Sequence, residues 1–281
     1  MIVVTGATGN VGRPLVRALS DAGERVTAVS RATRPPDDVR HVPADLFHPE
    51  TLKPAVDGAA ALFLLVPGVG AGLDIDAILA VAKAGGVDRV VSLSSQAVGT
   101  RPGSASYAPL RTIEDAVAGS GLKWTVLRIA GLASNAFGWA GSIREQRVVI
   151  APFGDVGLPV LDPVDVAEVA AAVLRDGDPH DGRTYVLTGP ATVTPRAQAA
   201  AIGAALGEPI GFVELSRDAA RERMLGFMPA PVVDGTLAVL GTPTEAERRV
   251  SPHVAEILGR APGSFADWAR RNAAAFRSEQ L

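Results

Sequence analysis

Three glycines near the amino terminus stand at a spacing that suits the binding of phosphate groups. They are Gly6, Gly9 and Gly12, in the segment TGATGNVG. The first glycine allows a tight turn, the second lets the backbone approach a pyrophosphate, and the third lets the following helix pack closely. The amino terminus of that helix adds free amide groups and a partial positive charge. We therefore expect the loop to bind a dinucleotide through Gly6, Thr8, Gly9, Asn10, Val11 and Gly12.

The segments on both sides of this loop predict the elements that position it. Residues 1–4 form a short apolar run that indicates a strand, and residues 25–30 indicate a second one. Between them, the apolar residues of 11–22 recur at helical spacing, and Gly23 can end the helix. Glycine loops also occur in α/β proteins that bind no nucleotide. A strand, a glycine loop and a helix in a βαβ unit of about 30 residues nevertheless favour the dinucleotide interpretation.

The end of the second strand indicates which dinucleotide is bound. An acidic residue there would bind the ribose hydroxyls and repel a 2′-phosphate. This strand ends instead in Ser30 and Arg31, with Arg34 close behind. An arginine can bind phosphate through a planar, charge-assisted fork, and a serine can donate its hydroxyl. The sequence therefore favours NADPH, with NADH possible; the alternative is that both arginines are merely solvated.

Composition excludes several other classes of function. The 281 residues are 47% hydrophobic, and the formal net charge of −3 leaves no basic surface for a nucleic acid. The chain has no cysteine, which excludes disulfides and thiolate chemistry, and its four histidines share no metal-ligand spacing. The apolar run at 59–67 is too short to cross a membrane, and because Met1 leads directly into the expected first strand, we expect no signal peptide. We expect a cytoplasmic monomer or homodimer without a metal site.

Strand-like and helix-like segments alternate along the first 190 residues. Strands are expected at 41–46, 60–66, 89–95, 124–129 and 182–189, and helices at 51–56, 73–85, 107–118 and 162–174. This alternation predicts an α/β fold of the Rossmann type, a doubly wound parallel sheet with helices on both faces. Ligands bind beyond the carboxyl ends of the strands in such a sheet.

We expect the chain to divide into two parts. Residues 1–190 would form an NAD(P)-binding domain and residues 191–281 a smaller substrate-binding lobe, with residues 131–150 contributing to the substrate pocket. In the smaller lobe, helices are expected at 195–206 and 263–276.

Three further local features are expected. Residues 228–241 are rich in Pro and Gly, and the charge-rich segments 217–223 and 245–249 indicate solvated helix faces. Asp162 and Asp165 are expected to serve as the N-cap and the N3 residue of a capping box.

The glycine spacing G-x-x-G-x-x-G resembles that of the short-chain dehydrogenase/reductase superfamily. Within it, TGATGNVG is similar to the atypical branch around the NmrA-like proteins and the quinone oxidoreductase 2 type, and the segment LGRAPGSFADW resembles the NmrA-like carboxyl terminus. The resemblance implies that the adenine lies at Asp45 and Leu46. The further cofactor contacts expected at the carboxyl ends of strands are Val66, Pro67, Ser94, Ile129 and Ala130.

The resemblance also implies a catalytic serine and a tyrosine assisted by a lysine four residues later. Ser95 matches the serine, and Tyr107 is the candidate tyrosine, but Arg111 replaces the lysine. Arginine could still lower the pKa of a phenol. Counting back from Glu114, which matches a glutamate common in the superfamily, instead places Ser106 and Leu110 in the two positions. Tyr107 is therefore either the proton donor or a packing residue.

Three functions remain open at this stage. The favoured one is NADPH-dependent hydride transfer to a hydrophobic ketone or quinone, because such acceptors need little acid assistance. The alternative is a non-catalytic NADP(H)-sensing, NmrA-like regulatory protein. Reduction of a C=C or ether bond, as in isoflavone-reductase-like relatives, is disfavoured by the missing lysine. The residues expected to bind the substrate are Asn135, Phe137, Trp139 and Met224.

Overall fold

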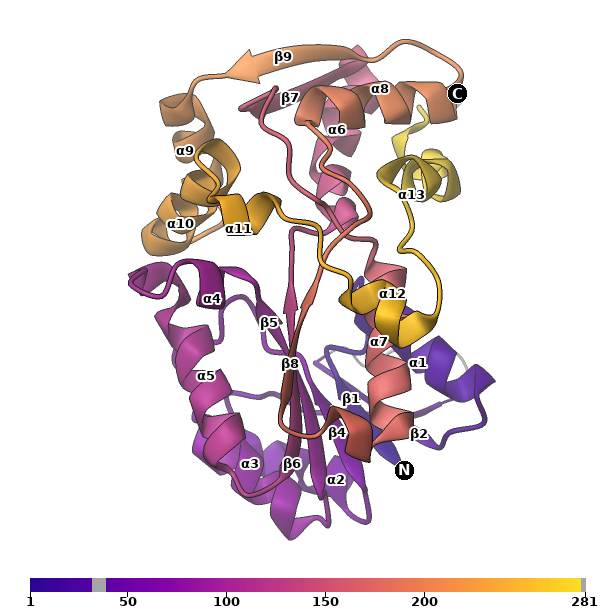
Figure 1. The fold of residues 1–281 in the computed structure, drawn as a ribbon, viewed down its shortest axis with the longest axis vertical. Helices are drawn as coiled ribbons and strands as arrows, with labels where there is room; N and C mark the ends of the chain where they lie inside the picture. The colour runs from indigo at the N-terminus through magenta and orange to yellow at the C-terminus, as the bar shows by residue number, and fades with distance from the viewer. Residues whose placement is uncertain (32–38, 279–281) are drawn as a thin grey trace.

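A seven-stranded parallel sheet forms the base of the molecule in the computed structural model, which describes residues 1–31 and 39–278 (Figure 1). Its strand order is β3-β2-β1-β4-β5-β6-β8. The strands are β1 (Ile2–Thr5), β2 (Val26–Ser30), β3 (Arg40–Pro43), β4 (Ala61–Leu64), β5 (Arg89–Ser95), β6 (Lys123–Ile129) and β8 (Arg183–Leu187). The order reverses between β1 and β4, which is where open α/β sheets bind ligands.

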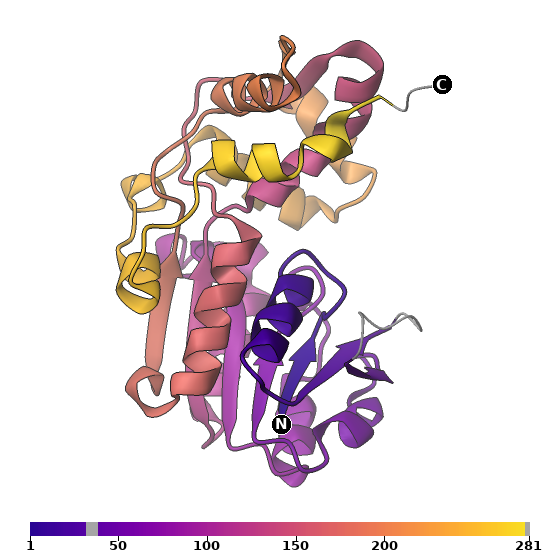
Figure 2. The same cartoon turned by 90° about the vertical axis from the view of Figure 1, so that its right-hand side faces the viewer.

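Helices cover both faces of the sheet, which confirms the predicted Rossmann-type fold. On one face lie α1 (Gly12–Asp21) and α7 (Pro163–Asp176), side by side in Figure 2. On the other lie α2 (Lys53–Val56), α3 (Ile75–Ala84) and α5 (Ala108–Gly119). Successive residues of β1 point to opposite faces of the sheet. Val4 therefore belongs to the hydrophobic cluster on the side of α1 and α7, and Val3 to the cluster on the side of α3 and α5.

A second group of elements lies beyond the carboxyl ends of the strands (Figure 1), and we call it the upper lobe. It contains η3 (Ala133–Trp139), α6 (Ala140–Gln146), β7 (Val148–Pro152), α8 (Pro195–Leu206), β9 (Gly211–Leu215), α9 (Arg217–Leu225), α10 (Ala230–Gly241), α13 (Phe265–Arg271) and η5 (Ala273–Phe276). Strands β7 and β9 pair in parallel, apart from the main sheet. No helix among the described residues is both long and apolar enough to span a membrane.

Short elements link the upper lobe to the sheet. They are α4 (Ala97–Thr100), η2 (Ala105–Tyr107), α11 (Glu245–Arg248) and α12 (His253–Leu258). Two further short elements belong to the base: η1 (Pro49–Leu52) precedes α2, and η4 (Asp178–His180) joins α7 to β8. Helix α12 returns to the base and packs on α7 and on β8. There His253 Nδ1 accepts a hydrogen bond from the Val186 amide of β8, at 3.0 Å. We therefore propose a division in which 133–152 belong to the upper lobe and α12 to the base, rather than one boundary at residue 190.

The structure contains several elements that the sequence did not predict and confirms two that it did. The Pro/Gly-rich segment 228–241 contains the helix α10, with Pro231 in its first turn, where a missing amide costs nothing. Helix α6, strands β7 and β9 and helix α12 were not predicted, because each is short. Helix α8 has the predicted bounds, 195–206, and α9 confirms a charge-rich helix at 217–223.

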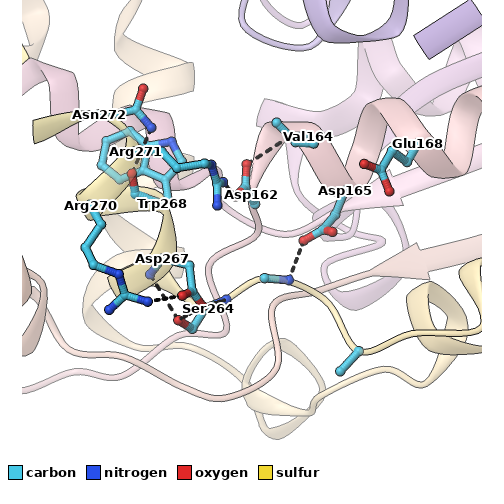
Figure 3. A network of polar contacts seen from close by, with 12 residues as sticks. Asp162, Val164, Asp165, Glu168, Ser264, Asp267, Trp268, Arg270, Arg271 and Asn272 are labelled. Carbon is cyan, nitrogen blue, oxygen red and sulfur yellow. Dashed lines mark hydrogen bonds and ion pairs between the residues drawn. The ribbon is translucent and has the colours of Figure 1, made fainter. Parts of the chain in front are cut away.

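A polar network joins the carboxyl-terminal segment to the first turn of α7 (Figure 3). Asp162 accepts from the Val164 amide at 3.0 Å, which confirms the predicted N-cap, and it also pairs with Arg271. Asp165 does not complete the predicted capping box. Its carboxylate is directed to the carboxyl-terminal segment, where it accepts from the Gly263 amide at 2.8 Å and pairs with Arg260 at 2.8 Å.

Replacing Arg260 by alanine should destabilise the fold, because Asp165 is only 3% exposed and would lose its charged partner. Burial already raises the pKa of Asp165, and the hydrogen bonds from Gly263 and Arg260 oppose that shift. We expect the free energy of unfolding in urea to fall by about 1–3 kcal/mol. The control is Arg270→Ala, which removes an exposed i,i+3 pair with Asp267 and should cost less than about 0.5 kcal/mol. Equal losses in the two variants would contradict this account of the network.

Candidate functional site

The glycine loop adopts a backbone that requires glycine at two of its three positions. Gly6 has a φ of +62°, in the left-handed region that favours glycine. A Cβ on Gly12 would lie 2.7 Å from the Ala7 Cα and closer still to the Gly6 carbonyl oxygen. Gly9 differs, because a Cβ there would meet only the Gly6 carbonyl oxygen, at 3.3 Å, and the residue is exposed. The space beside Gly9 is therefore open to a ligand.

The same loop presents backbone donors that lack acceptors. Val11, the N-cap residue of α1, makes no side-chain cap. Among the described residues, the amides of Asn10, Val11 and Gly12 donate no hydrogen bond. Arg13 Nε holds the loop by donating to the Thr8 carbonyl at 2.9 Å. Unpaired amides at a helix amino terminus suit an anion, so these residues fit the pyrophosphate of a dinucleotide.

The residues expected around the adenosine have other partners in this structure. Ser30 is buried, and its Oγ is hydrogen-bonded to His41 Nε2 at 2.9 Å. Arg31 is exposed, and Arg34 lies outside the described residues. Asp45 Oδ1 accepts from the Phe47 amide at 3.1 Å, which closes a local turn. Arg31 therefore remains the candidate for the 2′-phosphate, while one carboxylate oxygen of Asp45 already accepts a hydrogen bond within its own loop.

The other expected contacts follow the carboxyl ends of β4, β5 and β6. Because the strands are parallel, these ends share one edge of the sheet with the glycine loop after β1. Val66 and Ala130 are buried, and so is Leu46, which follows β3. Ile129 is half-buried, and Pro67 is exposed. The expected cofactor residues are thus brought to a single edge, whereas their individual contacts remain predictions.

Ser94 and Ser95 play different parts at the end of β5. The Ser94 hydroxyl donates to Glu114 Oε1 at 2.5 Å, and Glu114 pairs with Arg128 at 2.6 Å. Ser94 thereby attaches β5 to α5 through its side chain. Ser95 Oγ accepts from the Ala97 amide at 3.2 Å. That bond uses an oxygen lone pair and not the hydroxyl proton, so Ser95 can still donate to a ligand.

Tyr107 lies just before α5 and is half-buried. Burial raises the pKa of its phenol, the charge of Glu247 raises it further, and Arg101 opposes both. Arg111 does not take the place of the missing lysine, because its guanidinium donates to the carbonyls of Val98 and Ser104. The phenol therefore stays protonated at neutral pH and is a weaker acid than an ordinary tyrosine.

The two positions that the alternative register assigned to the tyrosine and lysine are also occupied by packing residues. Ser106 Oγ donates to the Pro231 carbonyl at 2.6 Å, and Leu110 is buried. Neither can act as the superfamily's Tyr–Lys pair. Among residues 1–31 and 39–278, no group of three or more His, Cys, Asp or Glu is placed to hold a metal ion.

The expected substrate residues all lie in the upper lobe. Phe137 packs against Trp268, with ring centroids 5.0 Å apart, and against Phe276, so most of its surface belongs to the lobe's core. Trp139 packs at the margin of that core, Met224 packs beside the smaller core of α9 and α10, and Asn135 is exposed. Asn135 is thus the most accessible of the four to a ligand.

A buried ion pair near the site was missed by sequence analysis. Residues 245–249 were expected to be solvated, yet Glu247 is 0% exposed and pairs with Arg101 at 2.7 Å. The spacing from Thr244 to Glu247 signals the capping box that begins α11, but no local pattern signals the burial of Glu247.

A family model described as NAD(P)H-binding matches residues 6–177. A (4-alkanoyl-5-oxo-2,5-dihydrofuran-3-yl)methyl phosphate reductase from Streptomyces griseus is 38% identical, over 99% of this chain and 100% of its own length. An NAD(P)H azoreductase from Xenophilus azovorans is 29% identical, over 98% of this chain and 99% of its own.

Solved structures show the same fold at lower sequence identity. An NADPH-dependent quinone oxidoreductase from Escherichia coli, complexed with NADPH, aligns with a TM-score of 0.79 at 22% identity, covering 96% of this chain and 99% of its own. NmrA, a negative transcriptional regulator in complex with NADP, aligns with a TM-score of 0.74 at 19% identity, covering 96% and 94%.

The glycine loop can be tested by two substitutions that should have opposite effects. Gly9→Val places a side chain in the open space beside the loop, so we expect a normal circular dichroism spectrum and loss of NADPH binding by calorimetry. Gly12→Ala places a methyl group against the Gly6–Ala7 backbone, so we expect a markedly lower Tm. A folded Gly9→Val variant that binds NADPH normally would show that the loop does not hold the pyrophosphate.

Proposed function

The chain belongs to the NAD(P)H-binding family, and from this premise we propose that it is an NADPH-dependent reductase of a hydrophobic, conjugated ketone or quinone. The observation that carries the proposal is a shared edge. The unpaired amides of the glycine loop, Ser95 and Tyr107 all follow the carboxyl ends of parallel strands or lie just beyond them. A dinucleotide held by its pyrophosphate at the loop can extend along this edge toward Ser95.

NADPH, when bound, supplies a hydride. The chain's own residues then have three tasks at the acceptor. The loop amides hold the phosphates, the upper lobe covers the sheet edge and limits the entry of water, and Ser95 donates a hydrogen bond to the oxygen on which negative charge develops. Tyr107 remains protonated, because burial and the charge of Glu247 raise its pKa by more than the charge of Arg101 lowers it.

The absence of a Tyr–Lys pair limits the acceptors that suit this site. An isolated ketone yields a localised alkoxide, which needs a strong proton donor. A quinone or another conjugated acceptor spreads the incoming charge over several atoms and needs less acid assistance. The named activities of two relatives fit conjugated acceptors: one reduces an alkanoyl dihydrofuranone that carries a methyl phosphate, and the other reduces an azo compound.

A regulatory role of the NmrA kind is the competing possibility. The likeness to NmrA supports the fold alone, at 19% identity. A sensor would bind NADP(H) tightly and turn over no acceptor. The measurement that separates the two is NADPH oxidation, followed at 340 nm, across quinones, aromatic ketones, azo dyes and unsaturated lactones. Tight NADPH binding without oxidation by any of them would favour the sensor.

Cofactor preference should depend on Arg31. We expect NADPH to bind at least about tenfold more tightly than NADH, because a charge-assisted bond to the 2′-phosphate contributes about 1.5–3 kcal/mol. Arg31→Ala should abolish this preference by weakening NADPH binding while leaving NADH binding unchanged. Arg183→Ala is the matched control, since Arg183 is exposed at the opposite, amino-terminal end of β8. Equal calorimetric affinities in the wild type would exclude the assignment.

The roles of Ser95 and Tyr107 should separate when a quinone is the acceptor. A positioned general acid contributes about 10²–10⁴-fold, so retention of quinone turnover within about threefold in Tyr107→Phe would show that this contribution is absent. We expect that retention, together with no loss of rate between pH 6 and pH 9 from ionisation of Tyr107. Ser95→Ala should lower kcat by about 10–100-fold through one lost donor. A hundredfold loss in Tyr107→Phe would instead identify Tyr107 as the proton donor.

A further inference from the structure

A wholly buried carboxylate joins the segment after β5 to the upper lobe. Glu247 of α11 accepts from Arg101 Nε at 2.7 Å and from Arg101 Nη2 at 2.8 Å, in a two-pronged pair. It also accepts from Thr100 Oγ1 at 2.9 Å and from the Thr244 amide at 2.8 Å. Burial acts to raise the pKa of Glu247, but the hydrogen bonds from Arg101, Thr244 and Thr100 outweigh it and hold the pKa below its usual value. The carboxylate is therefore charged and fully bonded.

The same guanidinium also binds the end of α10. Arg101 Nη2 donates to the Ala238 carbonyl at 3.1 Å and to the Thr242 carbonyl at 2.9 Å. These carbonyls lie in and just after the last turn of the helix, where the helix dipole favours a cation. One side chain from the base thus holds both α10 and α11.

Helix α10 rests without clearance on the segment that carries Tyr107. A Cβ on Gly235 would lie 2.5 Å from both the Cβ and the Oγ of Ser106, and 3.6 Å from Tyr107 Cε2. On the upper-lobe side, a Cβ on Gly241 would lie 2.5 Å from the ring of Phe153. Phe153 has a φ of +56°, which is strained for an aromatic residue. Two glycines of α10 therefore fix its position, Gly235 against Ser106 and Gly241 against Phe153.

The ion pair is close to both candidate catalytic residues. Gln96, which follows Ser95, donates from Nε2 to the Glu247 carbonyl at 3.4 Å. The charges of Glu247 and Arg101 both act on the phenol of Tyr107. Among the described residues, neither member of the pair is hydrogen-bonded to the glycine loop. The pair can therefore affect the acceptor side of the site without affecting the phosphate side.

We propose that Arg101 and Glu247 are positioning residues for the acceptor: they hold α10 against Ser106 and Tyr107, and α10 forms one wall of the acceptor site. This inference rests on the proposed reductase function. It follows that loosening the pair, or lifting α10 from Ser106, raises the KM for the acceptor and leaves NADPH affinity unchanged. A small displacement of a wall costs binding complementarity long before it unfolds the protein.

The first test lifts α10 by a single methyl group. Gly235→Ala adds that group against Ser106 while improving the helix propensity of α10, so any defect comes from the lost fit and not from a weakened helix. With menadione as acceptor, we expect the KM to rise about tenfold or more with kcat changed less than threefold. Ser106→Gly removes both clashing atoms and also the hydrogen bond to the Pro231 carbonyl, so the double variant should have the KM of Ser106→Gly alone. Gly119→Ala is the control, because a Cβ there meets nothing within 4 Å.

The second test removes the ion pair. Arg101→Ala alone would leave a buried carboxylate without its partner, so the pair is replaced as Arg101→Met with Glu247→Leu. We expect a folded protein with the NADPH Kd unchanged by calorimetry, a raised KM for menadione, and amide hydrogen exchange that accelerates in residues 230–241 but not in α7. Arg101→Lys keeps the charge but cannot form the two-bonded pair, so its KM for menadione should lie between those of the wild type and of the double variant.

The outcomes separate this inference from the proposed function. If the wild type oxidises NADPH with menadione and the folded Gly235→Ala and ion-pair variants keep the wild-type KM, the positioning role is wrong and the reductase function stands. A parallel rise in the NADPH Kd would also overturn it, because the effect would then be general. If the wild type binds NADPH but neither binds nor reduces any acceptor of the panel, both proposals fail together.

Discussion

The close approach of Gly12 to the Gly6–Ala7 backbone is the contact on which the rest of the molecule depends. It seats the first turn of α1 against the end of β1, at a point where the amides of Asn10, Val11 and Gly12 have no hydrogen-bond acceptor among the described residues. Helix α7 packs on α1, and the carboxyl-terminal segment is bound to the first turn of α7. The orientation of the upper lobe therefore traces back, through two helices, to a place where only glycine fits.

Charged groups in low-dielectric surroundings hold the two halves of the molecule in register. At the start of α7, Asp162 pairs with Arg271 and Asp165 with Arg260. Glu247 of α11 pairs with Arg101, the residue after α4. Each carboxylate is 3% exposed or less. Burying a charge is costly unless its partner is in place, so these pairs favour one relative orientation of the halves over others more than they add to stability.

The sequence was informative where the structure is determined locally. Buried parallel strands are continuous apolar runs, and α8 begins at a Thr-Pro N-cap and ends at a glycine, so both could be predicted. The burial of Glu247 could not, because its partner Arg101 is 146 residues away in the chain. Asp165 was misassigned for the same reason: its amide donor, Gly263, lies 98 residues further on. The periodicity of the strands was enough to place the expected cofactor residues at one edge of the sheet. The surroundings of Tyr107 depend on Arg101 and Glu247, whose approach no local pattern reveals.

The hydrogen bond from the Val186 amide to His253 has a consequence for how the protein behaves in concentrated solution. Strand β8 is the last of the sheet, and an uncovered outer strand is a template on which other chains can add. Helix α12 occupies that margin with an imidazole. The residues that anchor α12 on its other side are those of the network around Asp165. A chain that ended before residue 253 would lose α12 and leave the outer edge of β8 uncovered. Other chains could then pair with that edge, so the shortened protein should be prone to aggregation.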